Sequence, residues 1–339
     1  MRPVIKRHIP KYNDNDEYDV LRTYLFKQIG SYCSYCETPI SMDSAVEHKV
    51  PKSNKRGFQQ YQTRWSNLLV ACQSCNSAKG TTPDKNEVKG VKGDENLFLA
   101  TMKLWVWPDR TFSSDSIDIA TNDNTYQLFQ LVYEEKSQKE LIEAGMVKPI
   151  NTKTWPSWTT DKHKMVWILP NEAYLSSFED SEASQLRKRA LNTLKGLQLN
   201  YYNDSDMKFS DRRVINRTKA YLLAQESIDD FVEILSKTFK KRDIEGYIKL
   251  YMNDTLLMML QSMRLMIKTT GFWSVWFTVF RKVLENPTNS YLRWLRRDDR
   301  LFLLRSLLIA YIEGERRGNV DSLIFPGLDE ERLALNSFQ

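Results

Sequence analysis

All four cysteines of this 339-residue chain lie in two Cys-x-x-Cys pairs, and no other feature constrains the fold as much. The pairs are "CSYC" (Cys33, Cys36) and "CQSC" (Cys72, Cys75). Two such pairs can surround one tetrahedral Zn²⁺ with four thiolates. A redox or disulfide role is the alternative, and a reducing cytoplasm disfavours it. We therefore expect a closed structural zinc site, which holds loops in place and carries out no chemistry.

The segment between the two pairs is basic. From His48 to Gly80 the chain has no acidic residue, and its six basic residues are Lys49, Lys52, Lys55, Arg56, Arg64 and Lys79. Such a local positive field suits a phosphate backbone, so these six residues are the candidate DNA contacts. A solvated basic loop without a partner is the alternative.

Three short patterns in this region predict its local structure. "AVEHKV" (45–50) alternates like a strand, and the apolar run "WSNLLVA" (65–71) is a second strand. "CNSAKG" (75–80) has helical character and ends at a glycine, a common residue at helix C-termini. With the zinc clamp, the order is strand, basic loop, strand, helix, which is a ββα arrangement.

This combination resembles the HNH endonucleases of the ββα-metal type. The resemblance rests on "CSYCE", "EHKVPKS" and "WSNLLVACQSCNSAKG", and it covers about residues 30–82. It implies that His48 is the general base and that Asn67 braces the loop carrying it. It also implies that Glu47 and Asn76 bind a catalytic Mg²⁺ or Mn²⁺. Many members have histidine at the position of Asn76, although asparagine occurs there in active relatives.

The residue chemistry agrees with this interpretation. Phosphodiester hydrolysis needs an activated water and a Lewis acid near the scissile phosphate. A histidine with an ordinary pKa of about 6.5 suits the base, and oxygen ligands such as those of Glu47 and Asn76 suit Mg²⁺ or Mn²⁺. Each residue also has a plain alternative, because His48 can be a packed histidine and Asn76 an amide on a helix surface.

The rest of the chain predicts an α+β fold of three parts. These are an N-terminal zinc-stabilised ββα-metal module with its arm (1–98), a mixed α/β connecting region (99–180) and a predominantly α-helical C-terminal region (181–339). Residues 83–98 are expected to form a linker. The connecting region should contain strands at 102–112 and 163–170 and a helix at 126–145. Further helices are expected at 183–199, 211–239, 244–267, 272–284 and 300–313.

Two arginine-rich patches and one aromatic run stand out in the C-terminal half. "DRRVINR" places Arg213 and Arg217 one helical turn apart, and "YLRWLRR" contains Arg293, Trp294 and Arg297. Both patches are interpreted as contacts to DNA or a protein partner, or as solvated helix faces. The run "GFWSVWF" (271–277) is expected in the core.

No feature indicates a membrane or a secretory route. The first 19 residues lack the apolar stretch of a signal peptide, which favours a cytoplasmic protein. The most apolar segment, 255–283, contains Arg264 and Lys268, each of which would cost about 2.5–3.5 kcal/mol at a bilayer centre.

The layout also resembles nuclease subunits encoded beside an ATPase in anti-phage systems of the Septu type. The resemblance rests on the motifs above and on "ALNTLKGLQLN" followed by "DRRVINRT". It implies a separate ATPase partner, bound by residues from about 100 onward, because the chain has no P-loop motif. Arg293, Trp294 and Arg297 are the first candidates for that interface. The alternatives to a DNA endonuclease are a nucleic-acid-binding module without cleavage and a scaffold with a decayed nuclease module.

Overall fold

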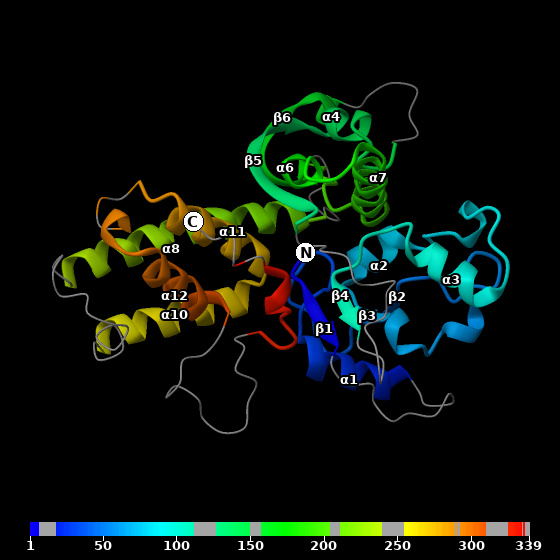
Figure 1. The fold of residues 1–339 in the computed structure, drawn as a ribbon, viewed down its shortest axis with the longest axis horizontal. Coiled ribbons are helices and arrows are strands. Elements are labelled where there is room, and N and C mark those ends of the chain that lie inside the picture. Colours follow the sequence, from blue (N-terminus) through cyan, green and yellow to red (C-terminus); the bar gives the residue numbers. More distant parts are fainter. Residues whose placement is uncertain are drawn as a thin grey trace.

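The structure, a computed structural model, has the mixed α+β fold expected from the sequence. It describes residues 1–6, 18–111, 127–149, 157–203, 211–238, 254–288, 290, 292–309, 325–333 and 335. Figure 1 shows three groups of elements around the N-terminal strand. They are an N-terminal unit, a hairpin group above it and a helical group on the other side.

The elements of each group follow one another along the chain. The N-terminal unit contains β1 (Val4–Lys6), α1 (Tyr18–Ile29), β2 (Val46–His48), β3 (Leu68–Val70), α2 (Gln73–Lys79), α3 (Asp94–Met102) and β4 (Asp109–Thr111). The hairpin group contains β5 (Phe129–Ser137), α4 (Gln138–Glu143), α5 (Ser157–Thr160), β6 (Lys162–Pro170), α6 (Glu172–Leu175) and α7 (Asp180–Leu197). The helical group contains α8 (Arg213–Thr238), α10 (Asp254–Thr270), α11 (Trp273–Glu285) and α12 (Arg297–Leu308).

The ββα arrangement lies in the N-terminal unit. β2 and β3 are antiparallel, with His48 opposite Leu68, and α2 follows β3 directly. Cys72 caps α2 because its sulfur accepts a hydrogen bond from the backbone N–H of Cys75, and Gly80 ends the helix with a φ of +56°. The predicted strand, loop, strand and helix are therefore confirmed.

The loop between β2 and β3 folds back on itself at Gly57. A Cβ atom at this position would lie 1.6 Å from the carbonyl oxygen of Pro51, so only glycine fits. Two backbone hydrogen bonds close the turn, from Gly57 N to Ser53 O at 2.6 Å and from Phe58 N to Pro51 O at 2.8 Å. These contacts define the shape of the loop, whose Pro51 and Ser53 line a cavity next to His48.

The N-terminal unit continues beyond the expected boundary at residue 98. That boundary falls inside α3, whose Phe98 is fully buried and packs against Phe58 and Tyr61 of the loop. Further on, β4 pairs in parallel with β1. The prediction of a linker at 83–98 is wrong for residues 94–98, because an apolar face of α3 covers the basic loop.

The hairpin group corrects one predicted helix. Residues 126–145 were expected to be helical, but β5 is a nine-residue strand that pairs antiparallel with β6, and only α4 is helical there. Ser137 forms a capping box with Glu140, so α4 begins where the strand ends. The strand expected at 163–170 is confirmed as part of β6.

The helical group has its own apolar core. Trp273, Trp276 and Phe280 of α11 are buried, as the sequence predicts. Helices expected at 183–199 and 272–284 are found as α7 and α11 with shifted ends. Those expected at 211–239 and 300–313 are found as α8 and α12, although residues 239 and 310–313 lie outside the described part of the chain. The helix expected at 244–267 is described only from Asp254, as α10. Among the described residues, no helix combines the length and apolar character needed to cross a bilayer.

Candidate active site and zinc centre

The two cysteine pairs meet in one cluster. The sulfur atoms of Cys33, Cys36, Cys72 and Cys75 all lie within 4.8 Å of one another, and no disulfide joins them. Cys36 Sγ and Cys72 Sγ are 3.6 Å apart, close to the ~3.8 Å expected between thiolates that share a tetrahedral zinc ion.

The donor set and its burial fit Zn²⁺. Burial raises the pKa of the Cys33 and Cys75 thiols, and a bound Zn²⁺ supplies the charge that keeps coordinating thiols deprotonated. Cys33 comes just after α1 and Cys72 caps α2, so the ion would fasten α2 to the end of α1. A cluster of this kind is closed and leaves no position for a substrate.

His48 ends β2 and is half-buried at the edge of a cavity. Its Nε2 lies 2.9 Å from the carbonyl oxygen of Gln62, which can only accept a hydrogen bond. Nε2 therefore carries the proton, and Nδ1 is the basic nitrogen of the ring. Burial lowers the pKa of His48 to about 4, assisted by Lys52 and Lys79 and opposed by the Gln62 carbonyl. The imidazole is consequently neutral at physiological pH.

Glu47 precedes His48 on β2, is 3% exposed and lines the same cavity. Its Oε1 lies 2.8 Å from Nζ of Lys79 on α2, which is also buried. Burial raises the pKa of Glu47 and lowers that of Lys79, and each charge offsets part of the other's shift. Lys79 was expected to contact DNA, but it is instead the partner of the carboxylate expected to bind metal.

Asn67 is fully buried between the two ends of the basic loop. Its Oδ1 accepts a hydrogen bond from Val50 N at 2.8 Å, and its Nδ2 donates to Val50 O at 3.1 Å and to Tyr61 O at 3.2 Å. Its backbone carbonyl accepts from Lys49 N at 2.8 Å. These bonds join the chain just after His48 to the chain just before β3, and the bracing role of Asn67 stays a prediction.

A cavity of about 800 Å³ brings the candidate residues together. Glu47, His48, Asn76 and Lys79 all line it. Asn76, on α2, is half-buried, because the helix places it next to Cys75 at the cavity wall. The basic loop and α1 add Arg22, Pro51, Lys52, Ser53, Asn54, Gln59 and Gln62 to the lining, and the remaining lining residues are Val46, Gly80 and Thr81.

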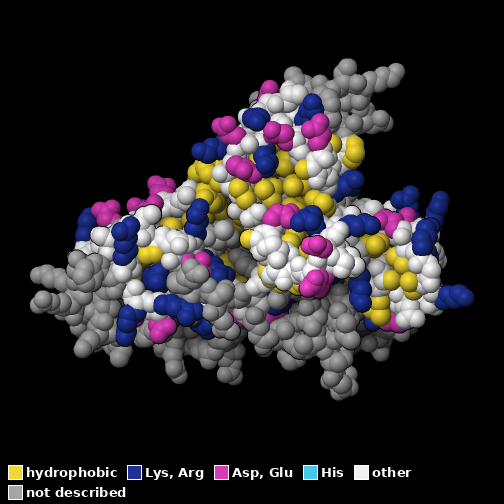
Figure 2. All heavy atoms as spheres, turned by 45° about the horizontal axis from the view of Figure 1, so that its top comes forward, with side chains coloured by type: hydrophobic (Ala, Val, Ile, Leu, Met, Phe, Trp, Pro, Cys, Tyr) yellow, Lys and Arg dark blue, Asp and Glu magenta, His cyan; other side chains and the backbone are white. Residues whose placement is uncertain are grey.

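The six basic residues separate into three kinds. Lys52, Lys55 and Arg56 are exposed, so they stay candidates for DNA contact. Arg64 is half-buried and bound to Glu95 on α3 at 2.7 Å, and Lys49 is fully buried against Asp109. Lys49 and Lys79 are buried and each faces a carboxylate, and their contact with DNA stays a prediction. Figure 2 shows other Lys and Arg side chains projecting around this end of the molecule, on the right.

Sequence reasoning missed a buried charge cluster beneath the site. Asp109 of β4 accepts from Nζ of Lys49 at 3.0 Å through both carboxylate oxygens, and Lys6 of β1 lies 3.0 Å from one of them. Lys6 also donates to the carbonyl oxygens of Trp65 and Leu68 at 2.7 Å. All three side chains are fully buried. No local pattern signals this cluster, because its members are far apart in the sequence.

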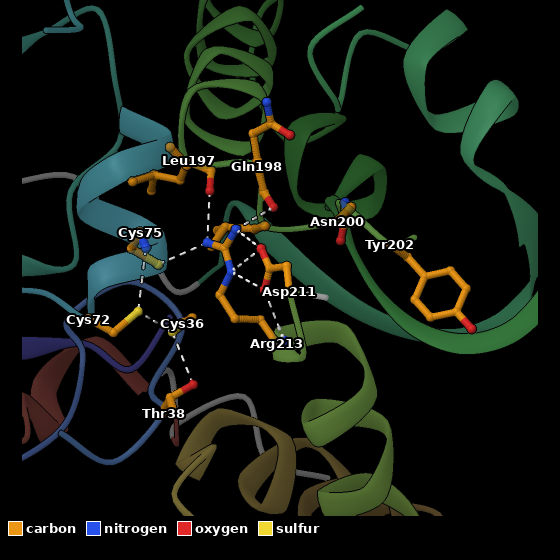
Figure 3. A network of polar contacts seen from close by, with 12 residues as sticks. Cys36, Thr38, Cys72, Cys75, Leu197, Gln198, Asn200, Tyr202, Asp211 and Arg213 are labelled. Atoms are coloured by element: carbon orange, nitrogen blue, oxygen red, sulfur yellow. Dashed lines mark hydrogen bonds and ion pairs between the residues drawn. The ribbon is translucent and has the colours of Figure 1, made fainter. Parts of the chain in front are cut away.

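The arginines of "DRRVINR" are also placed differently from the prediction. Arg213 and Arg217 are 5% and 2% exposed, so neither a DNA contact nor a solvated helix face describes them. Arg217 donates to the carbonyl oxygens of Val166 and Leu199. Arg213 reaches the zinc centre, as Figure 3 shows.

Comparison with known proteins agrees with the geometry. Residues 33–82 match the profile of the HNH endonuclease family, so this part of the chain is an HNH endonuclease domain. The chain is also similar to the Septu protein PtuB of Bacillus thuringiensis, with 33% identity over 70 residues. That match covers 20% of this chain and 26% of the relative, so it spans about a quarter of the curated protein. No solved structure matches the chain.

Proposed function

We propose that this chain is a metal-dependent endonuclease that hydrolyses phosphodiester bonds in DNA. The observation that carries the proposal is the state of His48. It lines the cavity, burial lowers its pKa, and its Nε2–H donates to the Gln62 carbonyl, so Nδ1 is the nitrogen that we propose as the proton acceptor. An HNH endonuclease domain over residues 33–82 supports a nuclease function.

In the proposed reaction, Nδ1 of His48 accepts a proton from the water that attacks the phosphorus atom. The Gln62 carbonyl keeps the ring oriented and stabilises the imidazolium once the proton has moved. A negatively charged phosphate in the cavity raises the pKa of His48 and makes it a stronger base. The carboxylate of Glu47 and the amide oxygen of Asn76 would hold Mg²⁺ or Mn²⁺, which supplies Lewis-acid stabilisation of the leaving oxygen.

The proposed DNA path runs over the exposed part of the basic loop. Lys52 lines the cavity, and Lys55 and Arg56 follow on the same loop. Arg22 approaches from α1 on the cavity wall. Positively charged side chains around a cavity of this size suit a phosphate backbone, which dominates the affinity of DNA binding.

Nicking of supercoiled plasmid tests the proposal. The wild-type protein should nick with Mg²⁺ or Mn²⁺ and should be inactive in EDTA. His48→Ala should retain one zinc ion per chain and lose cleavage, whereas His163→Ala, the same change on β6, is the matched control. Cleavage by His48→Ala at the wild-type rate would show that another group is the base.

One observation favours the alternative of DNA binding without cleavage. Lys79 already supplies a positive charge to Glu47, so a buried carboxylate is compensated without any divalent ion. In that case fluorescence anisotropy would show DNA binding in EDTA, and no nicking would occur over a full Mg²⁺ and Mn²⁺ titration. Measurable nicking that depends on His48 excludes this alternative.

We further propose that the chain is the cytoplasmic nuclease subunit of an anti-phage system of the Septu type, working with an ATPase subunit. The local similarity to Septu protein PtuB supports the assignment. Arg293, in the 3-10 helix Leu292–Trp294, and Arg297, the first residue of α12, are exposed, while the side chain of Trp294 lies outside the described part of the structure. Co-purification with an ATPase from the adjacent gene tests the idea, and Arg293→Ala with Arg297→Ala should weaken the complex. Full association of that double variant would place the interface elsewhere.

A further inference from the structure

Arg213, the first residue of α8, contacts the zinc centre from the helical group. Its Nη1 donates to Sγ of Cys75 at 3.0 Å, although 138 positions separate the two residues. Figure 3 shows the guanidinium between the second cysteine pair and the end of α7. A cation from outside the HNH domain therefore lies directly on a sulfur of the metal cluster.

The guanidinium is fixed by further partners before it meets the sulfur. Its Nε lies 2.8 Å from both carboxylate oxygens of Asp211. Nη1 also donates to Leu197 O at 2.9 Å, and Nη2 donates to Gln198 O at 3.1 Å. Because the guanidinium is planar and its N–H groups form a rigid fork, these bonds define the direction of the N–H that faces Cys75.

The contact between Arg213 and Cys75 is important because four thiolates around Zn²⁺ leave the cluster negatively charged. Four thiolates around Zn²⁺ carry a net charge of about −2, and three of the four cysteines are buried. Among the sulfur contacts of the described residues, Cys36 meets the hydroxyl of Thr38 and Cys72 meets a backbone N–H, whereas Cys75 meets a charged donor. Hydrogen bonds from charged donors are roughly twice as strong as neutral ones.

The helical group also contacts the chain next to the first cysteine pair. Oε2 of Glu37, the residue after Cys36, accepts from Ser274 N at the start of α11 at 2.7 Å. The backbone carbonyl of Glu37 accepts from Phe272 N at 3.2 Å. A Cβ atom at Gly271 would lie 2.5 Å from the same carbonyl oxygen, so a glycine is needed for this approach. α8 and α11 therefore hold one cysteine pair each.

We infer that Arg213 is a positioning residue of the zinc centre, which retains the ion and shields Cys75 by donating to its sulfur. The helical group is thus part of the metal site, and the position of α8 is coupled to that of α2. Since α2 also carries Asn76, this coupling links the helical group to the cavity wall.

Zinc retention and site-specific labelling test the inference in the full-length protein. Arg213→Met should lower zinc affinity about 10- to 100-fold in competition with a chelator, the usual effect of removing a group that supports a metal ligand. N-ethylmaleimide should then modify Cys75 faster than it does in the wild type, which mass spectrometry can resolve. Arg212→Met changes the exposed neighbouring arginine and should behave like the wild type.

Two further experiments test the inference if Arg213→Met does not fold. One uses Arg213→Gln, which keeps a polar side chain, and the other measures hydrogen exchange in the wild type. Removal of zinc from the wild type should accelerate amide exchange at residues 211–217, while α12 stays protected. Arg213→Gln should still bind zinc more weakly than the wild type, because an amide lacks the charge. Wild-type zinc affinity in a folded Arg213 variant, or unchanged exchange at 211–217 after zinc removal, would overturn the inference.

Discussion

Replacement of Asp109 by asparagine should destabilise the N-terminal unit severely. Asp109→Asn preserves the size of the side chain but removes the negative charge that faces two buried ammonium groups. Lys49 donates to both carboxylate oxygens at 3.0 Å, and Lys6 lies 3.0 Å from one of them. The substitution therefore leaves two cations in the core without a counter-charge.

The expected loss is about 3–5 kcal/mol, the usual cost of leaving a buried charge without its partner. Lys6 keeps the carbonyl oxygens of Trp65 and Leu68, so the larger part of the cost falls on Lys49. A loss of this size is a large fraction of the 5–15 kcal/mol that typically stabilises a domain. It should lower the melting temperature by about 10 °C.

Thermal unfolding followed by tryptophan fluorescence measures the effect. Asp43→Asn is the matched control, because this exposed aspartate lies in the same unit and should change stability by less than about 0.5 kcal/mol. Lys49→Met in the Asp109→Asn background removes one uncompensated ammonium and should recover much of the loss. If Asp109→Asn costs less than about 1 kcal/mol, or if Lys49→Met does not recover stability, the cluster does not act as an ion pair.

The same cluster predicts a pH dependence. Burial alone would raise the pKa of Asp109, but Lys49 and Lys6 outweigh burial and lower the pKa from 3.8 to about 2. A lowered pKa means that the stabilisation is complete above about pH 4 and is lost as the pH falls through about 2. Wild-type stability should therefore fall over this range, and Asp109→Asn should lack this part of the acid sensitivity.

Three further predictions concern the two metal sites and the base. Cys72→Ser should lower the zinc content and the solubility of the chain, because zinc binding is coupled to folding. Metal analysis and expression yield measure the two effects, and full zinc occupancy would contradict a four-cysteine site. Glu47→Ala and Asn76→Ala should lower nicking by orders of magnitude, with partial recovery at high Mn²⁺, and unchanged rates in both would place the metal ligands elsewhere. Because burial lowers the pKa of His48 in the free enzyme to about 4, kcat/KM for cleavage should hold down to about pH 5 and fall as the pH nears 4. A midpoint near the ordinary 6.5 would contradict this environment.

The sequence predicts the four-cysteine cluster well because its information is local. Each Cys-x-x-Cys pair is a short motif, and the strand, loop, strand and helix between and after the pairs follow from apolar patterns of a few residues. The same holds for Trp273 and Trp276, whose helical spacing indicates a core face. In such segments neighbours in the chain are also neighbours in space.

Counting basic residues in the sequence does not predict which of them are exposed, because the fold buries some of them. Lys49 and Lys79 belong to the same basic run as Lys52, but β2 and α2 turn the first two inward toward Asp109 and Glu47. Their partners lie 60 and 32 residues away in the chain, so no local pattern indicates them. The position of Arg213 was not predicted for the same reason, since its sulfur partner Cys75 lies 138 positions away in the chain.

The strand at 129–137 shows a different limit. "FQLVYEEKS" combines apolar and charged residues at spacings that also suit a helix, and its strand partner begins more than twenty residues later. Nine paired residues in β5 and β6 outweigh that local preference. Short apolar runs of this kind are ambiguous without knowledge of the partner strand.

The position of Asp109 has a consequence for the order in which the protein becomes active during synthesis. His48 leaves the ribosome long before Asp109, and translation at about 5–20 residues per second separates them by roughly 3–12 s. Until β4 pairs with β1, Lys49 lacks its carboxylate and the loop after His48 lacks its anchor. The nascent chain therefore carries His48 for several seconds before the site can close, so the proposed nuclease activity would begin only after much of the N-terminal unit has been made.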